Sequence, residues 1–467
     1  MIVSLPPFTL SQWEAFRPLL EAFARGDGRL VVDGLWGSAR ALVIAALLGE
    51  TGRPALVLVS GLGELHRACQ DLGFFDEAFG REPSRTVGFP PLQPALWRTG
   101  HHPEVEAERA LVCHRLLTGE ALTVVTTPAA LASTLLPPEE FRARTFRLAL
   151  GGSVDRAALF ERLALAGYER VETVVEVGQW SVRGGIVDIF SPTRPRPVRI
   201  EFFGDDVESL RAFDPSTQRS MEAVAGLDVL PLAAAGGSPS EAAAGANLLA
   251  YLPASAPAVL DDPKLLEAPP DDAPSPIPLA ELLEGRQRLE IGLLAATPPD
   301  PAVGRFTLET RSVGSFRGQF SRLAAELAQW LAEGFRVRLV CQDDLQVERL
   351  TQILREHLLE PTVSGTLGGP QGLGLLTGEC SSGFCLPALG LIVLTEEELF
   401  GARRRRLRRP LYQRGATVTA FTDLQVGDLV VHEEHGVGRY LGLKTLAVDG
   451  REGDFLLLEY AEGARLY

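Results

Sequence analysis

Apolar residues in the first part of the chain alternate between helical and strand-like spacing. Residues 13–23 and 39–48 carry apolar positions at helical spacing, whereas 30–32, 55–59 and 122–125 are short continuous apolar runs. A helix between two buried strands is typical of a βαβ unit, in which the two strands are parallel. The pattern therefore predicts a parallel sheet with helices packed against it.

The pattern changes after residue 144. A helical stretch at 156–165 is followed by three strand-like runs around 171–177, 182–190 and 198–203. One helix followed by several short strands predicts a compact α+β module.

Beyond this module, regular spacing is lost and then returns. The segments 233–246 and 268–278 are rich in Ala, Pro, Gly, Ser and Asp, so we expect loops or connections there. From residue 312 the helical and strand-like spacing resumes, with strands expected at 336–341 and 389–394. This part predicts a second, smaller αβ domain.

The last part of the chain begins with a basic run, Arg403 to Arg409, directly after an acidic stretch. Two interpretations stand for this run: a solvated linker helix with salt bridges, or a contact with DNA phosphates or another domain. From residue 424 short strands separated by glycine predict a small β barrel, which we expect to be incomplete at Tyr467.

Composition narrows the class of protein. The chain has 467 residues, too many for one hydrophobic core, with 46% hydrophobic and 22% charged residues, as in ordinary globular domains. No apolar run approaches the roughly 20 residues that span a bilayer, and the N-terminus lacks the features of a secretory signal. We therefore expect a cytoplasmic protein without membrane contact. The net charge of −15 argues against a chain whose whole surface binds DNA.

Cysteine and histidine spacing does not predict a metal site. Cys380 and Cys385 are close in sequence but have no second pair, so we interpret them as structural thiols. His101 and His102 are adjacent without a patterned third ligand, and we interpret them as solvated loop residues.

A segment between the strand at 30–32 and the helix at 39–48 aligns with the phosphate-loop pattern G-x-x-x-x-G-K-[ST]. Its residues are Gly34, Leu35, Trp36, Gly37, Ser38, Ala39, Arg40 and Ala41. Ala39 replaces the second glycine, Arg40 the lysine, and Ala41 the hydroxyl residue that holds magnesium. The only lysines of the chain, Lys264 and Lys444, lie outside any glycine loop. We predict a phosphate loop that is inactive.

An ATPase with an unconventional site is the alternative interpretation of this segment. Glu396 and Glu397 follow the apolar run 391–394, an order that is superficially similar to a Walker B strand. Without a working phosphate loop we interpret these residues as an ordinary strand end.

The run 198–203 alternates in a way that divides its residues between two faces. Val198, Ile200 and Phe202 share one face of a strand, and Arg199, Glu201 and Phe203 share the other. If the first set packs in the core, the second exposes an aromatic residue beside an arginine, and both residue types are common at binding hot spots. A solitary exposed phenylalanine needs no functional explanation, so both interpretations remain open here.

Three blocks carry a resemblance to a known family: 182–190, 198–205 and 213–220. They resemble the UvrB-homology module shared by the excision-repair protein UvrB and the bacterial transcription-repair coupling factors (Mfd). The resemblance implies that the module binds the damage sensor UvrA and that Arg183, Arg199 and Phe203 are the binding residues.

The C-terminal blocks 426–440 and 454–460 are similar to the CarD-like RNA polymerase interaction domain of the coupling factors, which UvrB lacks. The resemblance implies contact with the RNA polymerase β subunit, and we place it at Leu446, Phe455 and Leu457. The strand at 455–460 has the composition to join a partner sheet through main-chain hydrogen bonds. His432 and His435 are interpreted as residues that pack in the barrel.

Together these resemblances predict a multidomain α/β chain. Its predicted parts are a UvrB-like domain with a degenerate RecA-type phosphate loop (1–144), an inserted UvrA-binding α+β module (145–231), the returning part of the UvrB-like domain (232–311), a small αβ domain (312–400), a basic linker (401–422) and an incomplete Tudor/SH3-like β barrel that binds RNA polymerase (423–467).

Full-length members of the family continue into a RecA-like translocase motor, which uses ATP and Mg²⁺. Nothing in this chain corresponds to the motor, so we expect no cofactor, no metal and no catalytic residue here, and any DNA contact to involve the full-length protein or Arg403 to Arg409. The favoured hypothesis is an adaptor between UvrA and RNA polymerase. The alternatives are a UvrB-like ATP-dependent DNA repair enzyme, and a CarD-like transcription regulator that would leave the UvrB-like blocks unexplained.

Overall fold

A computed structural model describes residues 10, 12–92, 103–232, 245–266, 278–292, 303–363, 366–401, 429–432, 436–448, 451–460 and 465–466. The chain forms two compact units, Met1–Leu407 and Arg408–Tyr467. No helix in the described part of the chain is long and apolar enough to cross a membrane.

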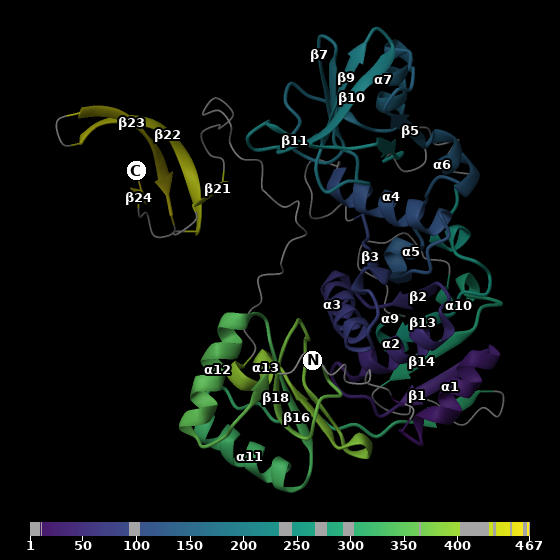
Figure 1. Cartoon of the computed structure of the whole chain (residues 1–467), viewed down its shortest axis with the longest axis vertical. Coiled ribbons are helices and arrows are strands. Elements are labelled where there is room, and N and C mark those ends of the chain that lie inside the picture. The colour runs from purple at the N-terminus through teal and green to yellow at the C-terminus, as the bar shows by residue number, and fades with distance from the viewer. Residues whose placement is uncertain are drawn as a thin grey trace. The chain divides into compact units, whose positions relative to one another are not determined.

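The first unit contains a seven-stranded sheet in the order β15-β1-β14-β13-β2-β4-β3, and every pairing in it is parallel (Figure 1). Its strands are β1 (Arg29–Asp33), β2 (Ala55–Leu58), β3 (Thr86–Phe89), β4 (Thr123–Thr126), β13 (Ala258–Asp261), β14 (Arg288–Gly292) and β15 (Gly304–Thr307). The predicted parallel sheet is confirmed. Two stretches of chain build it, because β13 and β14 lie between β1 and β2.

The first unit also contains the helices α1 (Phe16–Arg25), α2 (Ala39–Thr51), α3 (Leu62–Ala78), α4 (Pro103–Leu117), α5 (Pro128–Leu131), α6 (Pro138–Arg144), α9 (Pro263–Leu266) and α10 (Leu279–Leu282). Of these, α1, α2 and α3 share a buried core with this sheet, α4 contacts β3, and α9 contacts β13 and β14. Helix α2 is apolar nearly all round, and its residues from Leu42 to Leu48 are buried. Such a helix needs cover on every side, and a second sheet provides part of that cover.

Between β5 (Phe146–Ala149) and β12 (Gly226–Val229), which pair with each other, the chain forms the α+β module. Helix α7 (Arg156–Leu165) precedes a sheet in the order β11-β10-β9-β8-β7-β6. Its strands are β6 (Glu169–Arg170), β7 (Gln179–Arg183), β8 (Ile186–Ile189), β9 (Val198–Phe203), β10 (Asp206–Phe213) and β11 (Ser220–Ala223).

The strand expected at 171–177 is wrong. That stretch is irregular, although Val174 and Val177 are buried. The Gln179 side-chain oxygen accepts hydrogen bonds from the backbone N–H groups of Val175 and Glu176, so local side-chain bonds replace a strand ladder there. Two buried valines in a loop that is otherwise largely exposed produced a pattern that a strand shares.

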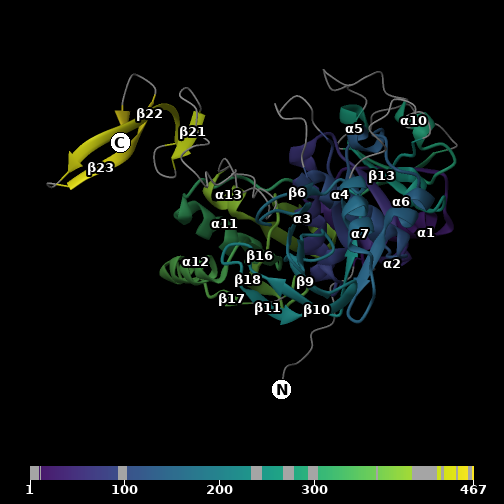
Figure 2. The same cartoon turned by 90° about the horizontal axis from the view of Figure 1, so that it is seen from above.

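A second sheet in the first unit has the order β17-β18-β16-β20-β19. Its elements are α11 (Phe320–Ala332), β16 (Arg336–Cys341), α12 (Asp344–Glu356), β17 (Thr362–Val363), β18 (Gly372–Thr377), β19 (Phe384–Leu386), β20 (Leu391–Leu394) and α13 (Glu396–Phe400). Leu339, Ile392 and Leu394 pack in one core with α11 and α12, which lie beside β16 and β18 (Figure 2).

The opposite face of this second sheet belongs to a different core. Val340, Leu391 and Val393 join the large cluster that contains the buried residues of α2 and α3. Alternate residues of β20 therefore face two separate cores, which explains why Leu391–Leu394 is a continuous apolar run.

The second unit contains four strands in the order β21-β22-β23-β24, and every pairing is antiparallel. They are β21 (Leu429–His432), β22 (Gly436–Val448), β23 (Arg451–Glu459) and β24 (Arg465–Leu466). Strands are thus present after residue 424 as expected, but two of them are not short, since β22 has 13 residues and β23 has 9.

The buried Arg338 of β16 generates a prediction about stability. Its guanidinium donates hydrogen bonds to the carbonyl oxygens of Leu367, Pro370 and Gly372, and burial lowers its pKa to about 10, so it stays charged at neutral pH. Arg338→Met leaves these carbonyls without their donor, and we expect a loss of about 3 kcal/mol in the free energy of unfolding, measured by urea denaturation. Arg349→Met, on the exposed side of α12, is the control. Equal losses in both variants would contradict this role.

Candidate functional site

The predicted phosphate loop lies between β1 and α2, at the carboxyl end of β1. Thr310, which follows β15, holds the loop through two hydrogen bonds. Its hydroxyl donates to the Gly34 carbonyl (3.0 Å) and accepts from the Trp36 N–H (2.8 Å). Gly34 has a φ of +90°, and a Cβ there would lie 2.7 Å from the Leu308 carbonyl oxygen. Glycine is required at this position by backbone packing.

Several N–H groups of the loop already have partners. A phosphate loop binds its ligand through free backbone N–H groups. Here the Trp36 N–H is used by Thr310, the Ala39 N–H donates to the Trp36 carbonyl (3.1 Å), and the Arg40 N–H donates to the Gly37 carbonyl (3.4 Å). The loop keeps the position of a phosphate loop, between β1 and α2, but these three N–H groups donate to protein acceptors.

Arg40, at the lysine position, is paired with an acid. Its Nη1 atom lies 2.7 Å from an oxygen of Asp261, the last residue of β13. Burial raises the pKa of Asp261, and Arg40 opposes that rise. The sequence interpretation missed Asp261, although the apolar run 258–260 followed by two aspartates was a usable signal. Arg40 and Asp261 neutralise each other.

The other acidic candidates lie after β20. The Thr395 hydroxyl and N–H donate to Glu398, which caps the start of α13. This capping box is a common way to begin a helix and fits the interpretation of an ordinary strand end. Glu397 nevertheless lines the same cleft as the loop.

This cleft is unfavourable for polyphosphate. It is lined by Gly37, Ser38, Arg40, Ala41, Ile44, Val57, Glu64, Arg67, Ala68, Asp71, Leu72, Asp261, Ser381, Ser382 and Glu397. Its two arginines face four carboxylates, so the balance of charge is negative. A nucleoside triphosphate would add negative charge to a cleft in which carboxylates already outnumber arginines.

The predicted binding strand β9 has the alternation that the sequence indicated. Val198, Ile200 and Phe202 are buried, whereas Glu201 and Phe203 are exposed. The Phe203 side chain is 73% exposed, and the turn that follows places Gly204 at a φ of +64°. The structure therefore confirms that the two aromatic neighbours point to opposite faces.

Arg199 does not stand exposed beside Phe203, contrary to our expectation. Its Nε lies 2.9 Å from Oδ1 of Asp188, and its Nη2 lies 2.9 Å from Oδ2. Its Nη1 donates to the Gln218 carbonyl. Its guanidinium also lies over the Phe213 ring, 4.7 Å from the centroid. Hydrogen bonding to Asp188 raises the pKa of Arg199. The Arg199 guanidinium therefore donates to residues of its own module.

Asp188 is the residue that links the predicted arginines. Its side chain is 2% exposed, and an Nη atom of Arg183 lies 3.8 Å from its Oδ2. The Arg183 side chain is itself 53% exposed. Asp188 stands opposite Arg199 in the β8–β9 register, so the fold brings a buried acid between two arginines from different strands. A lone acid in an apolar run, residues 186–190, was the available signal.

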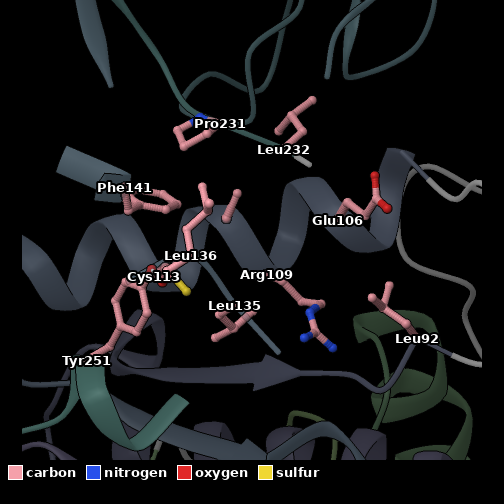
Figure 3. A pocket seen from close by; sticks show the side chains of 11 residues that line it. Leu92, Glu106, Arg109, Cys113, Leu135, Leu136, Phe141, Pro231, Leu232 and Tyr251 are labelled. Atoms are coloured by element: carbon pink, nitrogen blue, oxygen red, sulfur yellow. Dashed lines mark hydrogen bonds between the residues drawn. The ribbon is translucent and has the colours of Figure 1, made fainter. Parts of the chain in front are cut away.

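A separate pocket near α4 contains none of the predicted residues. Figure 3 shows Arg109 and Cys113 of α4 facing apolar side chains that include Leu135, Leu136 and Tyr251. Arg109 donates to the Pro90 carbonyl and to the Ser133 hydroxyl, and its guanidinium lies 4.3 Å from the Phe89 centroid. Burial lowers the pKa of Arg109 to about 10. Arg109 therefore links α4 to the segments that contain Pro90 and Ser133.

In the second unit the predicted polymerase-binding residues lie on a β hairpin. Leu446 stands opposite Gly453, Phe455 opposite Lys444, and Leu457 opposite Gly442. β24 pairs with Leu458 and Glu459, so that end of β23 is not a free edge. In the described residues no strand pairs with 451–457 on the side away from β22.

The remaining candidates have few described contacts. His432 ends β21, whereas His101, His102, His435 and the basic run Arg403 to Arg409 lie outside the described residues. Cys380 and Cys385 are free thiols. No group of three or more His, Cys, Asp or Glu side chains arranged to hold a metal occurs where the structure is described.

Comparison with known proteins gives two family-model matches. Residues 146–234 match the UvrB interaction domain, and residues 424–467 match the CarD-like/TRCF RID domain. The first range contains the sheet with Arg183, Asp188 and Phe203, and the second contains all four strands of the second unit.

Several curated relatives align with nearly the whole chain, and each is a transcription-repair-coupling factor. The protein of Bacillus subtilis (strain 168) is 26% identical over 98% of the chain, that of Myxococcus xanthus 29% over 95%, and that of Staphylococcus aureus (strain USA300) 24% over 97%. The chain spans 45–46% of the length of these relatives.

The buried carboxylate of Asp188 leads to a test of the module's internal ion pairs. Asp188→Asn removes the negative charge that two arginines share, and Arg199 stays largely covered by Phe213 and Gln218. We expect the free energy of unfolding to fall by about 2 kcal/mol in urea titrations. Asp205→Asn changes an exposed carboxylate in the same module and serves as the control. If both variants unfold at the same urea concentration as the parent, Asp188 does not hold these arginines.

Proposed function

The chain is related over nearly its whole length to transcription-repair-coupling factors, and on this premise we propose that it is the adaptor part of such a protein. In this role it links stalled RNA polymerase to UvrA in transcription-coupled nucleotide excision repair. Recruitment works through complementary surfaces, and no chemical step in the chain is needed.

The UvrA-binding surface of this proposal is the open face of the six-stranded sheet, within the segment that matches the UvrB interaction domain. The observation that carries it is the exposure of Phe203 on β9, with Arg183 presenting a half-exposed guanidinium on β7. Aromatic residues and arginine are the residue types most common at binding hot spots, and here both stand on strands of one sheet. Arg199 supports this face from below through Asp188.

The polymerase-binding surface of this proposal is the second unit, which matches the CarD-like/TRCF RID domain. We assign the contact with the β subunit to Leu446, Phe455 and Leu457 on β22 and β23. The unpaired side of residues 451–457 suits addition of a partner strand, because main-chain hydrogen bonds there need no change in the hairpin. The four-stranded sheet is assigned to a Tudor/SH3-like barrel.

The nucleotide chemistry of the whole protein belongs, in this proposal, to a motor outside this chain, where ATP and Mg²⁺ act. The seven-stranded sheet is then a RecA/UvrB-like domain that has lost its nucleotide site. The paired Arg40, the engaged loop N–H groups and the negative cleft support this assignment. A DNA contact through Arg403 to Arg409 is part of the same proposal.

Loss of the two exposed side chains is the direct test of UvrA binding. For Arg183→Ala combined with Phe203→Ala, we expect the dissociation constant for purified UvrA to rise at least about 30-fold, since hot-spot pairs contribute about 2 kcal/mol or more. Surface-immobilised chain titrated with UvrA gives the measurement.

Leu165→Ala is the matched control, because Leu165 on α7 is also 73% exposed and belongs to the same module. This variant should bind UvrA as the parent does. Equal binding by the parent and the double variant would remove the site assignment.

Nucleotide titration separates the adaptor from the alternative of a UvrB-like ATP-dependent repair enzyme. Calorimetry with Mg-ATP should give no binding heat at micromolar concentrations, because the cleft has excess carboxylates and the loop lacks its lysine. A micromolar dissociation constant for the isolated chain would refute this interpretation of Ala39, Arg40 and Ala41.

A further inference from the structure

One turn of the second sheet packs against the predicted phosphate loop. This turn, residues 378–383, connects β18 to β19 and lies more than 300 positions from the loop in sequence. The Ser38 hydroxyl donates to the Ser382 carbonyl at 2.5 Å and lies 3.0 Å from the Cys380 sulfur. Ser38 and Cys380 are both buried.

A carboxylate from α3 binds the same turn. The two oxygens of Asp71 accept from the N–H and the hydroxyl of Ser381, each at 2.6 Å. One residue earlier on α3, Gln70 donates to the Glu379 carboxylate at 2.8 Å. The turn is therefore held from two elements of the first sheet domain, α3 and the start of α2.

Glycines permit the close approach of the two backbones. A Cβ at Gly37 would lie 2.7 Å from the Gly383 carbonyl oxygen and 2.8 Å from the Ser382 hydroxyl oxygen. At the other end of the turn, a Cβ at Gly378 would lie 2.6 Å from the Phe74 ring. Real Cβ contacts are longer, so a side chain at either position requires the turn to move.

An apolar contact supports the turn from behind. Phe384, the first residue of β19, is fully buried, and its ring lies 6.3 Å from that of Phe75 on α3. Both residues belong to the core that joins the two sheet domains. The polar contacts of Ser38 and Asp71 therefore sit at the rim of a dry interface, where hydrogen bonds are least exposed to competition from water.

We propose that the emptied phosphate loop is a docking site for residues 378–383 of the same chain. The loop fits a turn that offers a carbonyl to Ser38 and donors to Asp71, while the one carboxylate of the turn, Glu379, accepts from Gln70. A phosphate offers no donors to Asp71 and would meet its carboxylate with like charge. This role goes beyond the adaptor function, because it explains what the loop does in a chain that binds no nucleotide.

The docked turn also fixes the relation between the two sheet domains of the first unit. In a nucleotide-driven domain pair, a ligand between the domains controls their closure; here a covalently attached turn takes the place of a ligand. Nucleotide binding and docking of the turn exclude each other at Gly37.

A disulfide across the contact tests the docking directly. In Ser38→Cys the new thiol lies beside the Cys380 thiol, and copper phenanthroline as oxidant accepts the two electrons as the two thiols lose their protons and form an S–S bond. We expect a cross-link between residues 38 and 380 in most molecules of the full chain, detected by mass spectrometry of the unreduced digest. Ser38→Cys combined with Cys380→Ala is the control. No cross-link in a folded Ser38→Cys chain would overturn the proposal.

A glycine pair provides a test that needs no new thiol. Gly37 and Gly52 flank α2 with φ values of +53° and +62°, but a Cβ at Gly52 meets no atom within 4 Å. Gly37→Ala and Gly52→Ala thus impose similar backbone strain, and only the first displaces the turn. Cys380 is a suitable reporter, because it is buried and its pKa is raised by that burial.

We expect native-state alkylation of Cys380 by iodoacetamide to be at least about tenfold faster in Gly37→Ala than in Gly52→Ala, as local opening of the turn exposes the thiol. Urea unfolding of both variants accounts for any difference in global stability. Equal alkylation rates in two chains of equal stability would overturn the proposal.

Discussion

Burial of both faces of the five-stranded sheet is the constraint on which the rest of the first unit depends. Its odd and even residues face different cores, one completed by α11 and α12 and the other by α2 and α3. Because no face is left for water, the polar groups inside need internal partners, and Arg338 meets the carbonyls of residues 367–372 for this reason. The same packing brings the turn at 378–383 to the phosphate loop, so the local chemistry of that loop follows from a contact between whole domains.

The α+β module solves a different problem, since one side of its sheet stays open. Neighbouring residues of β9 show the division: Phe202 fills the core while Phe203 remains exposed. The buried Asp188 holds Arg199 of the same face in an ion pair. This face presents the half-exposed Arg183 and the exposed Phe203, and also Arg211, which is exposed and stands opposite Arg199 in the β9–β10 register.

Local patterns allowed the sequence to predict the local features and left the distant ones hidden. The βαβ spacing predicted the parallel sheet, the loop between β1 and α2, and the alternation of β9, because each depends on residues close in sequence. Arg199 was placed wrongly, since its position is set by Asp188 on the neighbouring strand. Asp261 lies 221 positions from Arg40, and Ser382 344 positions from Ser38, so no spacing rule connects them. Apolar residues at 171–177 misled for a related reason, because two of them, Val174 and Val177, are buried by contacts with distant parts of the module and not by a strand.

The three positions at which the loop departs from the phosphate-binding pattern each have a structural role. Ala39 and Ala41 are buried in the core shared by the two sheets, where their small side chains fit between close elements. Arg40 forms an ion pair with Asp261, the last residue of β13. The retained glycines are explained in the same terms, since Gly34 and Gly37 are required by carbonyl oxygens of Leu308 and Gly383. A glycine pattern can therefore persist for packing alone, and its presence in a strand-loop-helix unit is no sign of nucleotide chemistry unless the lysine and the hydroxyl residue accompany it.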